Sequence, residues 1–164
     1  MIHKIPLKVA LKMMKYWPPY FGSGVSIESM NDDLTEIVVK MPLTKLNANY
    51  VGTHFGGSLY SMCDPFYMLM LLHHMKENHV VWDQAAKIEF IKPGKGTVRA
   101  KFQISHDEIN DFRKQALESF SLRPVFHCEV RDSDDEVVAK VEKHLYIRRK
   151  DAKERFSKKE HSNS

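Results

Sequence analysis

The stretch that decides the fold is residues 49–64, Asn-Tyr-Val-Gly-Thr-His-Phe-Gly-Gly-Ser-Leu-Tyr-Ser-Met-Cys-Asp. The pair Gly56-Gly57 stands at the mouth of a long apolar segment, and Asp64 lies about two helical turns inside it. The first turn of a helix has backbone N–H groups without intrahelical partners and carries the positive end of the helix dipole. Glycine lets a substrate carbonyl approach these donors closely. The stretch therefore predicts a helix start that can polarise a carbonyl, with a carboxylate nearby.

The segment from Gly56 to about Glu77 has the length and composition of a helix. Its apolar residues cover every face: Leu59, Tyr60, Met62, Cys63, Phe66, Tyr67, Met68, Leu69, Met70, Leu71 and Leu72. A helix that is apolar all round is a buried helix. Pro65 lacks a backbone N–H, so we expect it to kink the helix just after Asp64 and to free a backbone carbonyl there.

Strand-like segments flank this helix on both sides in the sequence. Alternating or β-branched patterns and turn residues place them at residues 24–30, 35–41, 86–90, 98–104, 126–130 and 137–147. A mostly polar segment at residues 107–121 is expected to form a short helix or lid. A single helix that is apolar on all sides needs a sheet curved around it. The predicted fold class is therefore α+β, with an antiparallel sheet wrapped around a long central helix. The open edges of such a sheet can pair with a second subunit.

The composition is that of an ordinary soluble globular protein. With 164 residues, 43% of them hydrophobic and 10% aromatic, the chain is expected to form one domain. Cys63 and Cys128 have no CxxC neighbour, so we expect reduced core residues of a cytoplasmic protein. The nine histidines are scattered, and neither HExxH nor paired-cysteine spacing occurs. We therefore predict no metal site and no cofactor.

The chain divides into three predicted segments. Residues 1–19 carry lysines at helical spacing and are predicted to form an amphipathic helix packed on the domain. A helix that lies on a membrane surface is the alternative. Residues 20–148 form the domain itself. Residues 149–164 form a basic tail that we expect to be solvated.

The positive charge is concentrated in the tail. From Arg148 to Ser164 there are seven Lys or Arg and three acids, so this end accounts for the whole net charge of +4 and the body is neutral. A solvated tail is favoured over contact with nucleic acid or with a membrane surface, and nucleic acid is not the expected partner. The longest nearly apolar stretch, residues 65–72, is too short to span a bilayer, so stable membrane insertion is not expected.

This layout and the 49–64 stretch together resemble the hotdog-fold acyl-CoA thioesterases, in particular the phenylacetyl-CoA thioesterase-like branch. In that branch an Asn stands three residues before a Gly-Thr, a His-Gly-Gly opens the helix, and an acid follows after six residues. The same spacing occurs between Asn49, Gly52-Thr53, Gly56-Gly57 and Asp64. The resemblance covers residues 20–148.

One position departs from the pattern of that branch. Phe55 stands where the branch has a histidine, and His54 lies one place earlier. The Phe-Gly-Gly form, with Asp64-Pro65 and the later Val81-Trp82-Asp83, is similar to an uncharacterised subgroup of tetrameric thioesterase-like proteins.

The resemblance implies hydrolysis of an acyl-CoA thioester to free acid and CoA. The thioester carbonyl would accept a hydrogen bond from the Gly57 N–H, where the helix dipole stabilises the oxyanion. Asp64, reaching across a dimer interface, would act as general base or nucleophile. Asn49 would position the water or the carbonyl, and His54 would approach the thioester.

The resemblance also implies contacts and an assembly. Gly56, Phe55 and Thr53 would contact the substrate, and the protein would form a homodimer or a dimer of dimers (a homotetramer).

Other interpretations remain open from the sequence. A hotdog protein that binds acyl groups or acyl-CoA without turnover is the main alternative, and a hotdog hydratase is weaker because His73-His74 lie far from Asp64 along the helix. For single residues, Asp64 can be a structural carboxylate paired to a cation, and His54 a loop histidine with a local hydrogen bond. Gly56-Gly57 can simply be a tight helix entry.

Overall fold

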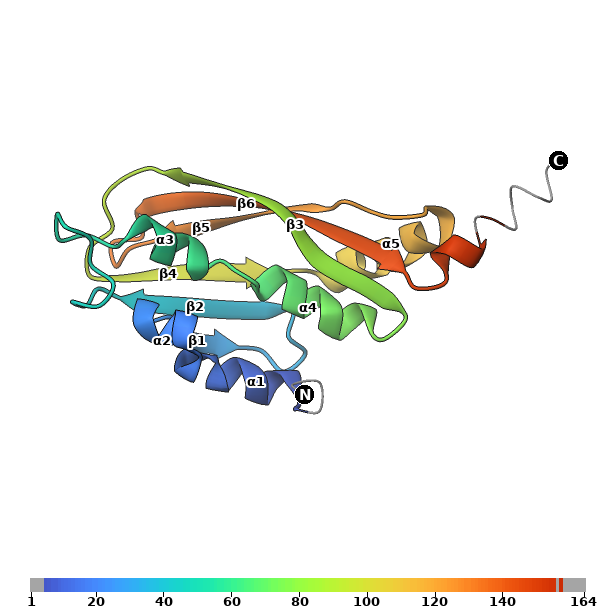
Figure 1. Cartoon of the computed structure of the whole chain (residues 1–164), viewed down its shortest axis with the longest axis horizontal. Coiled ribbons are helices and arrows are strands. Elements are labelled where there is room, and N and C mark those ends of the chain that lie inside the picture. Colours follow the sequence, from blue (N-terminus) through green and yellow to red (C-terminus); the bar gives the residue numbers. More distant parts are fainter. Residues whose placement is uncertain (1–4, 156, 158–164) are drawn as a thin grey trace.

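The frame of the molecule is one antiparallel sheet of six strands in the order β1-β2-β4-β5-β6-β3 (Figure 1). The computed structural model describes residues 5–155 and 157. The strands are β1 (Ser26–Met30), β2 (Glu36–Pro42), β3 (His79–Phe90), β4 (Thr97–Gln103), β5 (Val125–Arg131) and β6 (Val137–Arg149). Every strand pair is antiparallel. The α+β arrangement expected from the sequence is confirmed.

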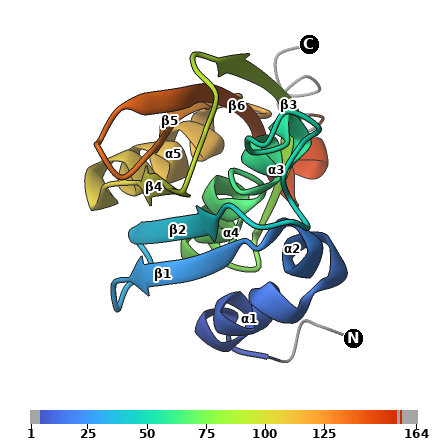
Figure 2. The same cartoon turned by 90° about the vertical axis from the view of Figure 1, so that its left-hand side faces the viewer.

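The buried helical segment lies inside the curve of the sheet, as the end view in Figure 2 shows. It consists of α3 (Gly56–Ser61) and α4 (Phe66–Met75). The side chains of α4 fill the core beside aromatic and aliphatic residues of the strands. Phe66 lies 5.0 Å from Phe102 of β4, and Tyr67 stacks at 4.6 Å on Phe126 of β5, measured between ring centroids. These contacts bury the apolar faces of helix and sheet together.

The central segment differs from the single kinked helix that the sequence predicts. Helix α3 ends at Ser61 and α4 begins at Phe66, so the helix is interrupted between these two residues. The break was expected as a kink, because Pro65 cannot donate the hydrogen bond that a continuous helix needs there. The carbonyl that Pro65 leaves without its helical donor is that of Ser61, and it accepts from the Asp64 N–H at 3.2 Å instead. The carbonyl of Asp64 accepts a hydrogen bond from the Tyr20 hydroxyl.

Strand β3 is longer than the sequence pattern indicates. The alternation marks residues 86–90, but the strand begins at His79 and pairs with β6 over most of its length. It is the edge strand, and most of its side chains are exposed or half-buried, so no clean alternation reveals its first half.

The amino-terminal helices cover one end of the sheet beside β1 (Figure 1). They are α1 (Leu7–Met13), a 3₁₀ turn η2 (Met14–Tyr16) and α2 (Pro18–Ser23). Leu11 and Tyr20 are buried and anchor them to the body. The first four residues of the predicted 1–19 helix lie outside the described part of the chain.

Helix α5 (His106–Glu118) connects β4 to β5, and a short helical turn follows β6. A capping box between Ser105 and Glu108 satisfies the first N–H groups of α5. After β6, Ala152 is 1% exposed, so the start of the predicted tail packs against the body. Most of that tail lies outside the described residues. None of the helices in the described residues has the length and hydropathy needed to cross a bilayer.

Candidate active site

The loop before α3 is closed by Asn49. Its side-chain Oδ1 accepts hydrogen bonds from the backbone N–H of Val51 at 3.1 Å and of Thr53 at 3.0 Å, and its Nδ2 donates to Thr53 Oγ1 at 2.8 Å. Gly52 has a φ of +80°, in the left-handed region that favours glycine. Asn49, Gly52 and Thr53 therefore stand at the positions where this turn uses a side-chain amide, a left-handed φ and a hydroxyl.

His54 fastens the same loop to the connection between β3 and β4. Its backbone N–H donates to the Gly94 carbonyl, and its ring Nε2 donates to the Gly96 carbonyl, both at 3.0 Å. The residue is 3% exposed, and its buried Nδ1 has no hydrogen-bond partner within residues 5–155 and 157. Burial lowers the pKa of His54, partly offset by the Gly96 hydrogen bond. The ring is thus neutral, with its proton on Nε2.

Two aromatic rings lie directly on the glycines at the start of α3. A Cβ on Gly57 would stand 2.4 Å from the Phe55 ring, and a Cβ on Gly56 would stand 2.9 Å from the Phe90 ring. Both rings are more than half exposed, at 57% and 55%. The glycines therefore allow close aromatic packing on the backbone, and two half-exposed aromatic side chains cover the helix N-terminus.

A cavity of about 410 Å³ opens at this end of α3. It is lined by Asn49, Thr53, His54 and Gly56 together with apolar atoms of Leu59 and the segment 90–94. The structure thus brings four of the predicted site residues to one opening. Asp64 does not line it, because Asp64 lies beyond the carboxyl end of α3.

Asp64 stands in a separate ionic cluster whose centre is Lys143 of β6. The Lys143 Nζ donates to Asp64 Oδ1 at 2.6 Å and to the Tyr60 hydroxyl at 3.2 Å. It also lies 3.2 Å from Asp83 Oδ1. The Lys143 side chain is 1% exposed, whereas those of Asp64 and Asp83 are 42% and 22% exposed. A buried ammonium is thereby shared by two carboxylates from different elements.

Burial and the neighbouring charges shift the pKa values of Asp83 and Lys143. Burial raises the pKa of Asp83, and the neighbouring Asp64 adds to this rise, although Lys143 opposes it. Burial alone would lower the pKa of Lys143, but the hydrogen bond and charge of Asp64, together with Asp83 and Tyr60, outweigh it and raise the pKa. Lys143 therefore remains a cation.

The two thiols near this cluster are not suited to nucleophilic attack. Cys63 precedes Asp64 in the chain, and Cys128 lies on β5; both are buried and free. The pKa of Cys63 is raised by its hydrogen bond with Cys128 and by burial. A thiol with a raised pKa stays protonated, and the thiolate is the reactive form.

Comparison with known proteins places the chain in a family. The model of a domain of unknown function, DUF4442, matches residues 8–147. The chain belongs to the DUF4442 family. No curated protein matches this DUF4442 chain.

Solved structures resemble this DUF4442 protein in fold. A Pseudomonas aeruginosa protein, PA5026, described as a probable thioesterase, matches with a TM-score of 0.76 at 18% identity, over 88% of this chain and 97% of its own. Thioesterase HI1161 of Haemophilus influenzae matches with a TM-score of 0.64 at 13% identity, over 88% of this chain and 92% of its own. A Chlorobaculum tepidum protein of unknown function matches with a TM-score of 0.69 at 18% identity, over 87% of this chain and 94% of its own. The DUF4442 chain has the hotdog fold.

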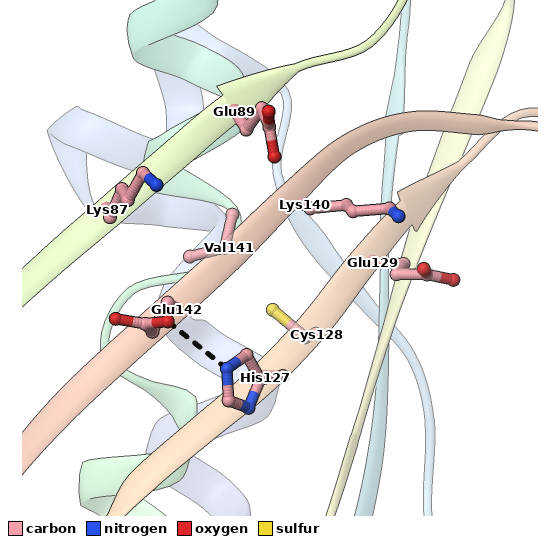
Figure 3. Close-up of a pocket in the computed structure, with 8 residues that line it drawn as sticks. All are labelled: Lys87, Glu89, His127, Cys128, Glu129, Lys140, Val141 and Glu142. Atoms are coloured by element: carbon pink, nitrogen blue, oxygen red, sulfur yellow. Dashed lines mark hydrogen bonds and ion pairs between the residues drawn. The ribbon is translucent and has the colours of Figure 1, made fainter.

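A second cavity, of about 260 Å³, lies among charged side chains of β3, β5 and β6 (Figure 3). The strand register sets opposite charges side by side, with Lys87 opposite Glu142 and Glu89 opposite Lys140. Glu142 also pairs with His127. Because side chains alternate across a strand, Glu142 points away from the face that carries its neighbour Lys143. This charged surface of the DUF4442 protein is thus separate from the Asp64 cluster.

Sequence reasoning missed Lys143 and Tyr20 as partners of Asp64. The alternation of β6 offered a signal, because position 143 falls on the inward face between Val141 and Leu145. A lysine at an inward position of a strand needs a buried counter-charge. For Tyr20, which the DUF4442 chain carries on α2, no local pattern indicates a contact 44 residues away.

Proposed function

We propose that this protein is a hydrolase that cleaves an acyl-CoA thioester to a free acid and CoA. The proposal is carried by the coincidence of the glycine helix start and the half-exposed carboxylate of Asp64 in a hotdog fold. Similar folds in proteins described as thioesterases support it. The reduced, buried Cys63 and Cys128 fit a cytoplasmic location.

In this proposal the chemistry is divided between two groups. The thioester carbonyl accepts a hydrogen bond from the Gly57 N–H, which stabilises the negative charge that develops on the oxygen. The Asp64 carboxylate takes a proton from the attacking water or itself attacks the carbonyl carbon. Asn49, Thr53, Gly56 and Phe55 shape the entrance, and the Phe55 ring turns aside to admit the substrate. His54 keeps the entrance loop in place and remains a candidate contact of the thioester.

Both groups are proposed to meet across a dimer interface. In one chain, Gly57 lies at the amino end of α3 and Asp64 lies beyond its other end, so the residues are roughly 10 Å apart along the helix direction. A second copy can supply the missing group. Strand β3 has twelve residues and, among the described residues, pairs only with β6, so its free edge is open to the β3 of another copy.

The activity is tested with purified protein and a panel of acyl-CoAs, with a thiol-reactive dye to detect free CoA. We expect turnover, and we expect Asp64→Asn to lower kcat by about 10²- to 10⁴-fold while the fold is retained. A fully active Asp64→Asn protein would remove Asp64 from the mechanism.

The shared site is tested by mixing two inactive variants. Asp64→Asn and Gly57→Val proteins, unfolded and refolded together, should form mixed dimers with one intact site each. Activity should then return to about a quarter of the wild-type rate. No recovery, with mixed dimers verified by mass spectrometry, would place Gly57 and Asp64 in the same chain's site.

A second function, binding of acyl groups or acyl-CoA without turnover, is favoured by one observation. Lys143 donates a hydrogen bond to one oxygen of Asp64, so that oxygen is occupied and does not take a proton from water. Saturable binding of acyl-CoA without release of CoA at any chain length would establish this function instead.

A further inference from the structure

Lys143 occupies a position where a strand places apolar side chains. Its neighbours on the inner face of β6, Val141 and Leu145, are 1% and 0% exposed, and Lys143 itself is 1% exposed. An ammonium in such a place is strongly unfavourable unless it is paired and hydrogen-bonded. The residue therefore needs an explanation beyond the packing of the sheet.

The partners of Lys143 come from three elements that meet only in the folded protein. Asp64 lies in the break between α3 and α4, Tyr60 on α3, and Asp83 on the edge strand β3. The titratable groups that face Asp64 are Lys143, Asp83, Tyr60, Tyr20 and Cys63. Lys143 is the one cation of this set.

The exposures of the cluster members differ in a way that assigns their roles. Lys143 is enclosed and cannot reach a substrate, whereas 42% of the Asp64 side chain is accessible. One carboxylate oxygen of Asp64 is held from inside by Lys143, and its backbone carbonyl is held by Tyr20. Asp64 is thus oriented at two points and open on its remaining side.

We propose that Lys143 is the positioning residue of the active site, which holds the Asp64 carboxylate in the orientation that faces the thioester. The proposal rests on the proposed thioesterase function. The Lys143 Nζ lies 2.6 Å from Asp64 Oδ1 and 3.2 Å from Asp83 Oδ1, so the ammonium is anchored between the two elements that carry these carboxylates. Its buried hydrogen bond restricts the rotation of the Asp64 side chain.

The decisive variant is Lys143→Met, which keeps the length of the side chain and removes its charge. We expect kcat to fall by about 100-fold, the effect of a misplaced reacting group, with little change in KM. Lys140→Met, on the outer face of the same strand, is the matched control and should match the wild type.

A second variant separates positioning from folding. Lys143→Met leaves Asp64 and Asp83 side by side without their shared cation, which can unfold the protein, whereas adding Asp83→Asn removes one of the two carboxylates. Positioning predicts that the folded double variant, checked by circular dichroism, still has a low kcat with little change in KM. A folded double variant with wild-type kcat would overturn the proposal.

An activity-free measurement keeps this inference distinct from the proposed function. Crystal structures of the wild type and of the folded double variant show whether the Asp64 carboxylate keeps its orientation without the Lys143 hydrogen bond. We expect the carboxylate to turn away or to spread over several rotamers in the double variant. A single, unchanged orientation would refute the role of Lys143, whether or not the wild type hydrolyses acyl-CoA. A displaced carboxylate in a protein without turnover would refute only the thioesterase function.

Discussion

Gly57→Ala separates the chemistry of the helix start from its stability. An alanine in a helix is ordinarily more stable than a glycine by about 0.5–1 kcal/mol, because the unfolded chain has less freedom to lose. At Gly57 the added methyl meets the Phe55 ring at 2.4 Å, so the ring must turn away. Phe55 is 57% exposed, which leaves on the order of 80 Å² of its surface buried. Losing about half of that contact costs roughly 1 kcal/mol at 25 cal/mol per Å².

The two effects nearly cancel, so we expect the stability of Gly57→Ala to lie within about 0.5 kcal/mol of the wild type. Gly22→Ala is the matched control, because Gly22 lies in the similarly short α2 and an added Cβ would meet nothing within 4 Å. It should raise the free energy of unfolding by about 0.5–1 kcal/mol, seen as a rise of about 1–4 °C in Tm.

The activity of the two variants should diverge. The alanine methyl at Gly57 blocks close approach of the thioester oxygen, and the loss of one oxyanion donor lowers kcat by about 10²- to 10³-fold. Gly22→Ala should remain fully active. Urea unfolding and the acyl-CoA assay measure both quantities. Undiminished turnover in Gly57→Ala would refute the oxyanion role, and a loss of stability above about 3 kcal/mol would refute the reasoning that Phe55 turns aside.

Three further predictions concern the supports of the site. Tyr20→Phe should lower the free energy of unfolding, measured with urea, by about 1 kcal/mol, because it deletes the hydrogen bond to the Asp64 carbonyl. The control Tyr16→Phe, at an exposed position, should leave the free energy of unfolding unchanged. Phe102→Ala should cost about 3–5 kcal/mol by the same measurement, because the ring is 0% exposed and packs on two aromatic rings of α4. The pKa of His54 is lower in the folded than in the unfolded protein. As the pH falls through about 6.5, the unfolded state therefore binds the proton first and becomes more stable relative to the folded state. The stability contributed by neutral His54 is lost over this range. His54→Gln should therefore flatten the dependence of Tm on pH over that range; an unchanged slope would show that His54 has no part in it.

The apolar pattern predicted the layers of the fold but not the interruption of its central helix. Residues 56–77 are apolar on every face, and this pattern is the same for a kinked helix and for two helices in sequence. Pro65 indicated the place of the disturbance. Its extent, from Ser61 to Phe66, depends on contacts from α2 and β6 that come from distant parts of the chain.

The candidate site was predictable only in part, for the same reason. The spacing of Asn49, Gly52 and Thr53 encodes a local turn, and the structure brings Asn49 and Thr53 to the cavity at the start of α3. The hydrogen bond of the His54 ring goes to Gly96, 42 residues later, and no local pattern predicts it. Lys143 was visible as a break in the alternation of β6, but its partners were not.

The break at Pro65 connects the sequence to the proposed chemistry. Had the helix continued, the Asp64 carbonyl would accept the N–H four residues later and point along the helix axis. The break turns this carbonyl toward α2 and brings the side chain against Lys143 of the sheet, so one local irregularity fixes the backbone and the carboxylate of Asp64 together. Regular helix geometry offers no such double restraint. A residue held in this way has already lost most of its conformational freedom before substrate binds, which is the condition under which a single carboxylate contributes most to catalysis.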